Sequence, residues 1–172
     1  METVELTTRF EQTAELQARF EDWSAMLIHD DVKDVRNVPI HFTRLKQPLA
    51  RSRVGLLSTG GVHLRSQPPF DTARPDGDWS FRTIPSSTSG GDVAISHTHY
   101  NHGDADEDVN CMFPIDRLRE LAESGFIGGL SETFYGMMGF IPNGTHIVEE
   151  TGPELARRFK EEGTDVVLLT PS

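Results

Sequence analysis

The sequence has little that would support secretion, disulfide bonding or membrane insertion. Cys111 is the single cysteine of 172 residues, so an internal disulfide is excluded, which fits a reducing compartment. No apolar run approaches the roughly eighteen residues of a membrane span, and the first residues lack the basic start and apolar core of a secretory signal. We therefore expect a soluble, cytoplasmic protein with no membrane partner.

Basic residues are also scarce. Lys and Arg number 16 against 27 Asp and Glu, which gives a net charge of −11 with no basic run, and this argues against binding to nucleic acid. The phosphate-binding patterns GxxxxGK[ST] and GxGxxG are both absent, so we expect no nucleotide cofactor.

The hydrophobic pattern predicts an N-terminal helix and connector over 1–50, followed by an α/β domain over 51–172. The N-terminal helix, at 6–28, has one apolar stripe. In the second part we expect strands at 53–58, 79–84, 92–95 and 165–170, and helices at 114–122 and 151–162. Continuous apolar strands that alternate with helices predict an α/β fold: a largely parallel sheet with flanking helices. No helix follows the last strand, so we expect the sheet to be incomplete at the C-terminus.

The densest chemistry lies in residues 96–111, which hold three of the seven histidines and the cysteine. If the strand at 92–95 continues, His97 and His99 point to the same face, and His102 follows where the chain can turn back. Three such imidazoles can hold a divalent metal, Zn²⁺ or Fe²⁺. The alternative is a polar loop whose histidines cap backbone carbonyls.

Further candidates surround this segment. Asp104 and Asp106 supply carboxylates to ligate the metal or orient the histidines. Gly60 and Gly61 follow a strand, where glycine allows a positive φ and the close approach of a ligand, although a plain tight turn explains them too. The predicted roles are catalytic for His63, His97, His99 and Asp104, substrate-binding for Gly60, Gly61, Tyr100 and Asp106, and metal-binding for His97, His99 and His102.

Three segments that follow predicted strands should meet at one edge of the sheet. They are the turn at 59–63, the histidine segment from 97 to 108, and the end of the chain at 170–172. In open parallel sheets ligands bind beyond the carboxyl ends of the strands. The sequence therefore predicts a binding site at this edge.

Several segments together resemble one known family. They read TGGVHLRSQPPF at 59–70, GDWSFR at 77–82, SHTHY at 96–100 with DAD at 104–106, and NCMFPIDRL at 110–118. They are similar to the selenoprotein B component of the glycine, betaine, sarcosine and D-proline reductases. The likeness runs from about residue 51 to the last residue and does not cover the N-terminal helix.

The resemblance implies an oxidoreductase that reduces a small amino acid or related compound and cleaves a bond at the α-carbon. The family's attacking group is a selenocysteine or cysteine directly after a strand of the VLLTP kind. Here that strand is followed by Ser172, the last residue. Either a selenocysteine codon was read as a stop, or the chain is a short paralogue whose chemistry depends on the histidine segment. We expect Cys111 to be structural.

The expected partners are a small-molecule substrate, a redox partner protein and further subunits, identical or different. Two alternatives remain open at this point. The sequence His97-x-His99-x-Asn101-His102 is close to the HxHxDH motif of metal-dependent hydrolases, in which metal-bound water is the nucleophile, but Asn101 replaces the aspartate. The chain could also be a non-catalytic binding or subunit module that pairs with a chain carrying the redox residue.

Overall fold

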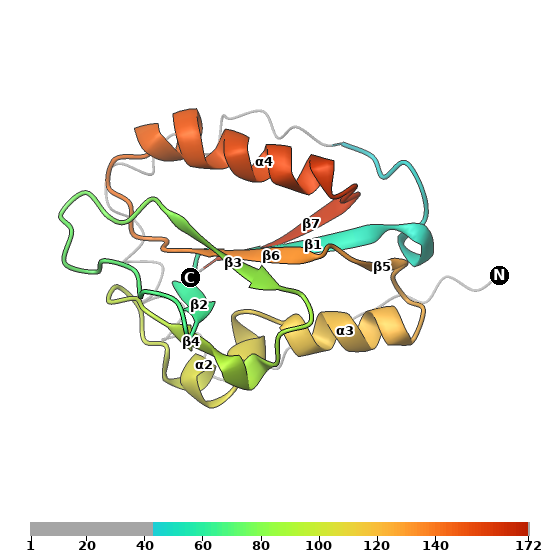
Figure 1. Ribbon diagram of the computed structural model, residues 1–172, viewed down its shortest axis with the longest axis horizontal. Coiled ribbons are helices and arrows are strands. Elements are labelled where there is room, and N and C mark those ends of the chain that lie inside the picture. The colour runs from blue at the N-terminus through green and yellow to red at the C-terminus, as the bar shows by residue number, and fades with distance from the viewer. Residues whose placement is uncertain (1–42, 172) are drawn as a thin grey trace, which may run out of the picture. The chain divides into compact units, whose positions relative to one another are not determined.

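The computed structural model describes residues 43–171 and shows a five-stranded sheet between helices (Figure 1). The central strand β1 (Arg53–Ser58) pairs in parallel with β7 (Val166–Thr170) along its full length. On its other side it pairs in parallel with β5 (Gly129–Leu130) and then β6 (Thr133–Met137). Only β3 (Phe81–Pro85), beside β6, runs antiparallel. The predicted α/β fold with a largely parallel sheet is confirmed.

Helices cover both faces of this sheet (Figure 1). On one face lies α4 (Gly152–Glu161), which continues from a π-helical turn, η6 (Ile147–Thr151). Its buried Leu155 and Phe159 pack against Tyr135 and Met137 of β6. The helix approaches β1 so closely that a Cβ on Gly55 would lie 2.5 Å from the Phe159 ring.

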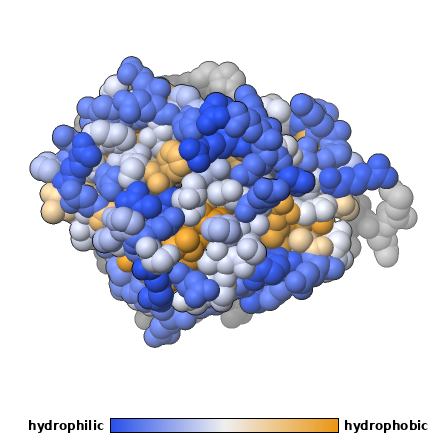
Figure 2. All heavy atoms as spheres, viewed as in Figure 1, coloured by the Kyte–Doolittle hydropathy of each residue, from blue (hydrophilic) through white to orange (hydrophobic). Residues whose placement is uncertain are grey.

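The other face of the sheet carries α3 (Ile115–Glu123) and the larger part of the core. Val54 and Leu56 of β1 alternate with the residues that face α4, as the period-two pattern of a strand requires. The core residues on this face are Val54, Leu56, Val62, Ile84, Val93, Phe113, Ile115, Leu118, Ile127 and Phe134. Figure 2 shows that the surface of this view is mostly hydrophilic, with apolar atoms emerging near the sheet edge between the helical layers.

A second, two-stranded sheet lies beside α2 (Gly103–Glu107) and consists of β2 (Val62–Leu64) and β4 (Val93–Ile95) (Figure 1). The strand predicted before the histidines is therefore present, but it lies outside the main sheet and ends at Ile95. Short 3₁₀ helices complete the fold: η3 (Leu49–Arg51), η4 (Gly90–Asp92) and η5 (Val109–Cys111).

The other predicted elements agree with the structure to within a few residues. The strand expected from 79 begins at Phe81, and the helices expected at 114–122 and 151–162 are α3 and α4. The predicted N-terminal helix lies outside the described residues, and the predicted domain boundary at 50/51 stays a prediction. Within residues 43–171, no helix combines the length and the apolar character needed to cross a bilayer.

Candidate functional site at the carboxyl ends of the parallel strands

The turn at residues 59–61 joins the segments that were expected to meet. The Thr59 amide donates to the carbonyl of Thr170 at the end of β7 (3.0 Å), and the Gly61 amide donates to the carbonyl of Met137 at the end of β6 (2.9 Å). The Ser96 amide, just after β4, donates to the Gly61 carbonyl (2.9 Å). One short turn thus ties two parallel strands of the main sheet to the start of the histidine segment.

Both glycines are required by contacts within the chain. Gly61 has a φ of +74°, and a Cβ there would lie 2.3 Å from the Ser96 carbonyl oxygen. A Cβ on Gly60 would lie 2.6 Å from Cγ of Met112. The close approach predicted for a ligand is therefore made by the chain's own atoms, and the contact of these glycines with substrate stays a prediction.

Tyr100 fixes the histidine segment to this turn. Its hydroxyl donates to the Gly60 carbonyl at 2.9 Å. Burial of the phenol, with the nearby negative charges of Asp106 and Cys111, raises the pKa of Tyr100 to about 12. The hydroxyl therefore stays protonated, and a donor, at neutral pH.

His97 is buried beside Tyr100, with only 7% of its surface exposed and its ring centroid 4.6 Å from that of the tyrosine. Its Nδ1 accepts a hydrogen bond from the backbone amide of His99 (3.1 Å). Burial, and then the charges of His99 and His102, lower the pKa of His97 below 6.5. The ring is therefore neutral at pH 7, and because Nδ1 accepts, its proton lies on Nε2.

The three histidines of the predicted metal site do not converge. Since β4 ends at Ile95, strand alternation does not reach them: the rings of His97 and His99 lie 6.1 Å apart at 83°. His99 is exposed and stacks on Phe140, and Nδ1 of His102 lies 2.8 Å from Asp106 Oδ2. Among the residues described, no group of three His, Cys, Asp or Glu side chains could hold a metal ion.

His63 does not lie at the end of a strand, and Asp104 does not pair with a histidine of the predicted site. His63 is in the middle of β2, where its Nδ1–H donates to the Leu64 carbonyl and its Nε2 accepts from the Ser96 hydroxyl, both at 2.8 Å. Both nitrogens are thus used to hold β2 against the segment after β4. Asp104 is exposed on α2, and the carboxylate that pairs with a histidine is that of Asp106.

Two buried side-chain polar atoms in the described part of the chain lack a hydrogen-bond partner: Nε2 of His97 and Oγ1 of Thr170. Both atoms belong to residues that contact the 59–61 turn; this turn, His97, Tyr100 and Thr170 are called the strand-end site below. The Thr170 carbonyl bonds the first residue of the turn. His97 packs beside the last, with its Cβ 3.2 Å from where a Cβ on Gly61 would lie. Thr170 was not among the predicted site residues. Its place at the end of an apolar strand was the available signal.

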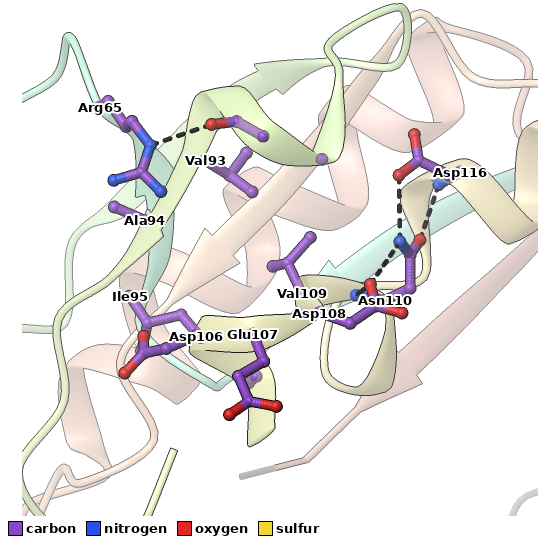
Figure 3. Close-up of a pocket in the computed structure, with 13 residues that line it drawn as sticks. Arg65, Val93, Ala94, Ile95, Asp106, Glu107, Asp108, Val109, Asn110 and Asp116 are labelled. Atoms are coloured by element: carbon purple, nitrogen blue, oxygen red, sulfur yellow. Dashed lines mark hydrogen bonds between the residues drawn. The ribbon is translucent and has the colours of Figure 1, made fainter. Parts of the chain in front are cut away.

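A separate hollow of about 460 Å³ lies along β4 (Figure 3). Arg65 and the η4 glycines form one end, and the Arg65 Nε–H donates to the Gly91 carbonyl at 2.9 Å. Four acidic side chains also line it: Asp106 and Glu107 of α2, Asp108 just before η5, and Asp116 of α3. The carboxylates of Asp108 and Asp116 each accept a hydrogen bond from the side-chain amide of Asn110. Hydrogen bonds from that side chain are the leading cause that lowers the pKa of each carboxyl group.

Comparison with known proteins identifies the family of this fold and site. Residues 32–172 match the glycine/sarcosine/betaine reductase selenoprotein B family. The chain belongs to this family. The match includes every residue of the strand-end site, and it confirms the resemblance seen in the sequence.

Curated relatives of the family show the same assignment. The chain is 45% identical over 132 residues to the D-proline reductase subunit gamma of Acetoanaerobium sticklandii, covering 77% of this chain and 53% of that protein. It is 28% identical over 127 residues to the glycine reductase complex component B subunit gamma of Carboxydothermus hydrogenoformans, covering 71% of this chain and 28% of that protein. The chain thus spans about half of the first relative and little more than a quarter of the second. No solved structure matches it.

The relatives are named as subunits of reductase complexes. The hydrolase alternative gains no support, since its motif residues His97, His99 and His102 do not come together in the structure.

Proposed function

We propose that the chain is a subunit of a reductase complex that reductively cleaves a small amino-acid substrate, with D-proline as the first candidate. The observation that carries the proposal is the 45% identity to a D-proline reductase subunit gamma. The relatives named for glycine and betaine reductase complexes are less similar, at 28% and 26% identity.

The proposed reaction breaks a bond at the α-carbon. For D-proline this is the bond between Cα and the ring nitrogen, and two electrons and two protons then give the open-chain 5-aminopentanoate. A pair of thiols, or a thiol and a selenol, supplies the electrons and protons and becomes the corresponding disulfide or selenenyl sulfide. This sequence has one cysteine, exposed on η5, so we propose that the electron donor includes a group from a redox partner or from chain beyond these residues.

We place the substrate at the carboxyl ends of β1, β6 and β7. The hydrogen bonds of the 59–61 turn, the burial of His97 and the position of Thr170 support this placement. The general preference of open parallel sheets for ligands at that edge supports it as well. Gly60, Gly61 and Tyr100 then form the wall of the site, and His97 and Thr170 are the described side chains with a buried polar atom that lacks a partner.

The test is turnover by the protein isolated from its own host together with its co-purifying subunits. With dithiothreitol as reductant, we expect consumption of D-proline and equal accumulation of 5-aminopentanoate. Glycine and betaine serve as parallel substrates. Turnover of either one in place of D-proline would support a reductase complex but contradict D-proline as its substrate. Consumption of none of the three by the intact complex would contradict the proposal.

A divalent metal on the histidine segment stays an untested prediction, and the arrangement of His97, His99 and His102 among the described residues does not support it. Elemental analysis of the same preparation tests it, and stoichiometric zinc or iron that is lost when His97 and His99 are replaced would support it.

A further inference from the structure

We propose that His97 and Thr170 bind the carboxylate of the substrate, with Nε2 of the imidazole and Oγ1 of the hydroxyl each donating to one carboxylate oxygen. The inference rests on the proposed function, because it takes the substrate to be an amino acid. It adds the part of the substrate that is recognised and the two side chains that recognise it.

The first support is the hydrogen-bond balance of the described residues. Buried polar groups in folded proteins are almost always paired, because an unpaired one forfeits its hydrogen bonds to water. The two exceptions among the described side chains are His97 Nε2 and Thr170 Oγ1. The backbone carbonyl of Thr170 accepts from the first residue of the 59–61 turn, and Cβ of His97 lies beside the last residue of that turn. A ligand that accepts from both would remove both exceptions at once.

The second support is the direction of the free groups. Nδ1 of His97 accepts from the His99 amide, so the ring hydrogen lies on Nε2, which can only donate. Tyr100, whose ring lies beside His97, gives its hydroxyl proton to Gly60 and does not bond the imidazole. The hydroxyl of Thr170 can also donate. The site therefore matches an acceptor with two oxygens.

The third support is what the substrates named in this family have in common. Glycine, sarcosine, betaine and D-proline carry primary, secondary, quaternary and ring nitrogens, so the nitrogen offers no shared hydrogen-bonding pattern. Each has a carboxylate on the carbon that bears the nitrogen. Hydrogen bonds from neutral donors to a carboxylate are charge-assisted and stronger than neutral pairs. A site shared by the family would therefore recognise this group.

The test uses the complex in which His97 is labelled with ¹⁵N, and three probes. D-Proline has both groups, cyclopentanecarboxylate keeps the carboxylate and replaces the ring nitrogen with carbon, and pyrrolidine lacks the carboxylate. We expect the first two to shift the Nε2 resonance of His97 with saturation, and pyrrolidine to leave it unchanged. An Nε2 resonance that does not respond to either carboxylate, or that responds equally to pyrrolidine, would overturn the inference.

Variants give a second readout. H97F keeps an aromatic ring and removes the donor, and H97Q keeps an N–H near the Nε2 position. Loss of one hydrogen bond to a charged group should weaken cyclopentanecarboxylate binding roughly 10- to 100-fold in H97F. H97Q should recover most of this affinity, and T170V should weaken binding less than H97F does. Equal binding by H97F and H97Q would contradict a donor role for His97.

The outcomes separate this inference from the proposed function. If the complex turns over D-proline while no carboxylate shifts the Nε2 resonance of His97, the proposed reductase function stands and the carboxylate site is wrong. If cyclopentanecarboxylate binds through His97 but no amino acid is reduced, the carboxylate site stands and the proposed reaction is wrong.

Discussion

The two halves of the histidine segment differ sharply, although they are adjacent in the sequence and both contain histidine. Residues 96–100 are held at the strand ends, with the Ser96 amide and the Tyr100 hydroxyl bonded to the 59–61 turn and His97 buried. Residues 101–108 leave that edge and form the short helix α2, where His102 and Asp106 pair on the surface. The comparison shows that a dense run of polar residues need not form a single site.

The physical reason lies in where β4 ends. Beyond Ile95 the chain is no longer paired in a sheet, so no alternation holds His97 and His99 on one face. Each histidine then takes the partner that its own surroundings offer. His97 is buried, His99 stacks on the ring of Phe140, and His102 pairs with the carboxylate of Asp106 one helical turn away.

The largest predicted effect concerns Gly61, the turn glycine that packs against the first half of the histidine segment. Gly61→Ala should destabilise the protein by roughly 2–4 kcal/mol, because the residue has a φ of +74° and the new Cβ would meet the Ser96 carbonyl. Gly103→Ala, at the start of α2, is the matched control: its Cβ would lie 3.4 Å from Asn101 Oδ1, so stability should change by no more than about 1 kcal/mol. Urea unfolding measures both. Equal effects would show that the turn does not depend on its glycine.

The second prediction concerns the hydrogen bond from Tyr100 to Gly60. Tyr100→Phe should lower the free energy of unfolding by about 1 kcal/mol, the usual net value of one such bond. The raised pKa adds a pH dependence. Since the folded-state pKa, about 12, lies above the ordinary 10.0, stability from the protonated phenol is complete below pH 10 and is lost as the pH rises through 12.

Phenolate absorbance of the folded protein checks this directly. In the wild-type protein Tyr100 should ionise near pH 12, and its contribution to the absorbance should vanish in the Tyr100→Phe variant. Tyr135, on the α4 face, supplies the comparison because burial raises its pKa too, and its transition should persist in the variant. An unchanged absorbance curve in the variant would contradict the assigned environment of Tyr100.

The smallest predicted effect is that of the ion pair in the second half. The side chains of His102 and Asp106 are 29% and 54% exposed, and surface pairs of this kind contribute about 0–1 kcal/mol. His102→Ala and Asp106→Ala, singly and together, should therefore give a coupling free energy below about 1 kcal/mol in urea unfolding. A coupling of several kcal/mol would mean that this half also forms a rigid site.

Local patterns in the sequence predicted most of the fold. Pro114 and the stripe Ile115, Leu118 and Leu121 predicted α3 to within one residue, and the apolar run before Thr170 predicted β7. The sequence did not show that β4 pairs with β2, because a strand's partner depends on the assembled fold. The meeting of the 59–61 turn with Ser96 and Thr170 at one edge agreed with the general rule for parallel sheets.

The individual roles within the site were harder to predict. His63 and His97 both looked like candidates, but the structure satisfies both nitrogens of His63 and leaves Nε2 of His97 free. Nδ1 of His63 bonds the neighbouring Leu64 carbonyl, and Nε2 bonds Ser96 in a tertiary contact for which the sequence has no signal. The sequence placed the segment from Thr170 at this edge, but it did not show that the Thr170 hydroxyl would be buried without a partner.

The most direct test of the account is hydrogen–deuterium exchange of the intact complex with and without D-proline. We predict that peptides covering residues 59–64 and 96–100 become more slowly exchanging when D-proline is bound, while peptides covering 101–110 do not change. Such a result would place the substrate at the carboxyl ends of the parallel strands. Protection of 101–110 with no change at 59–64 and 96–100 would contradict the account and move the site to the acidic hollow along β4.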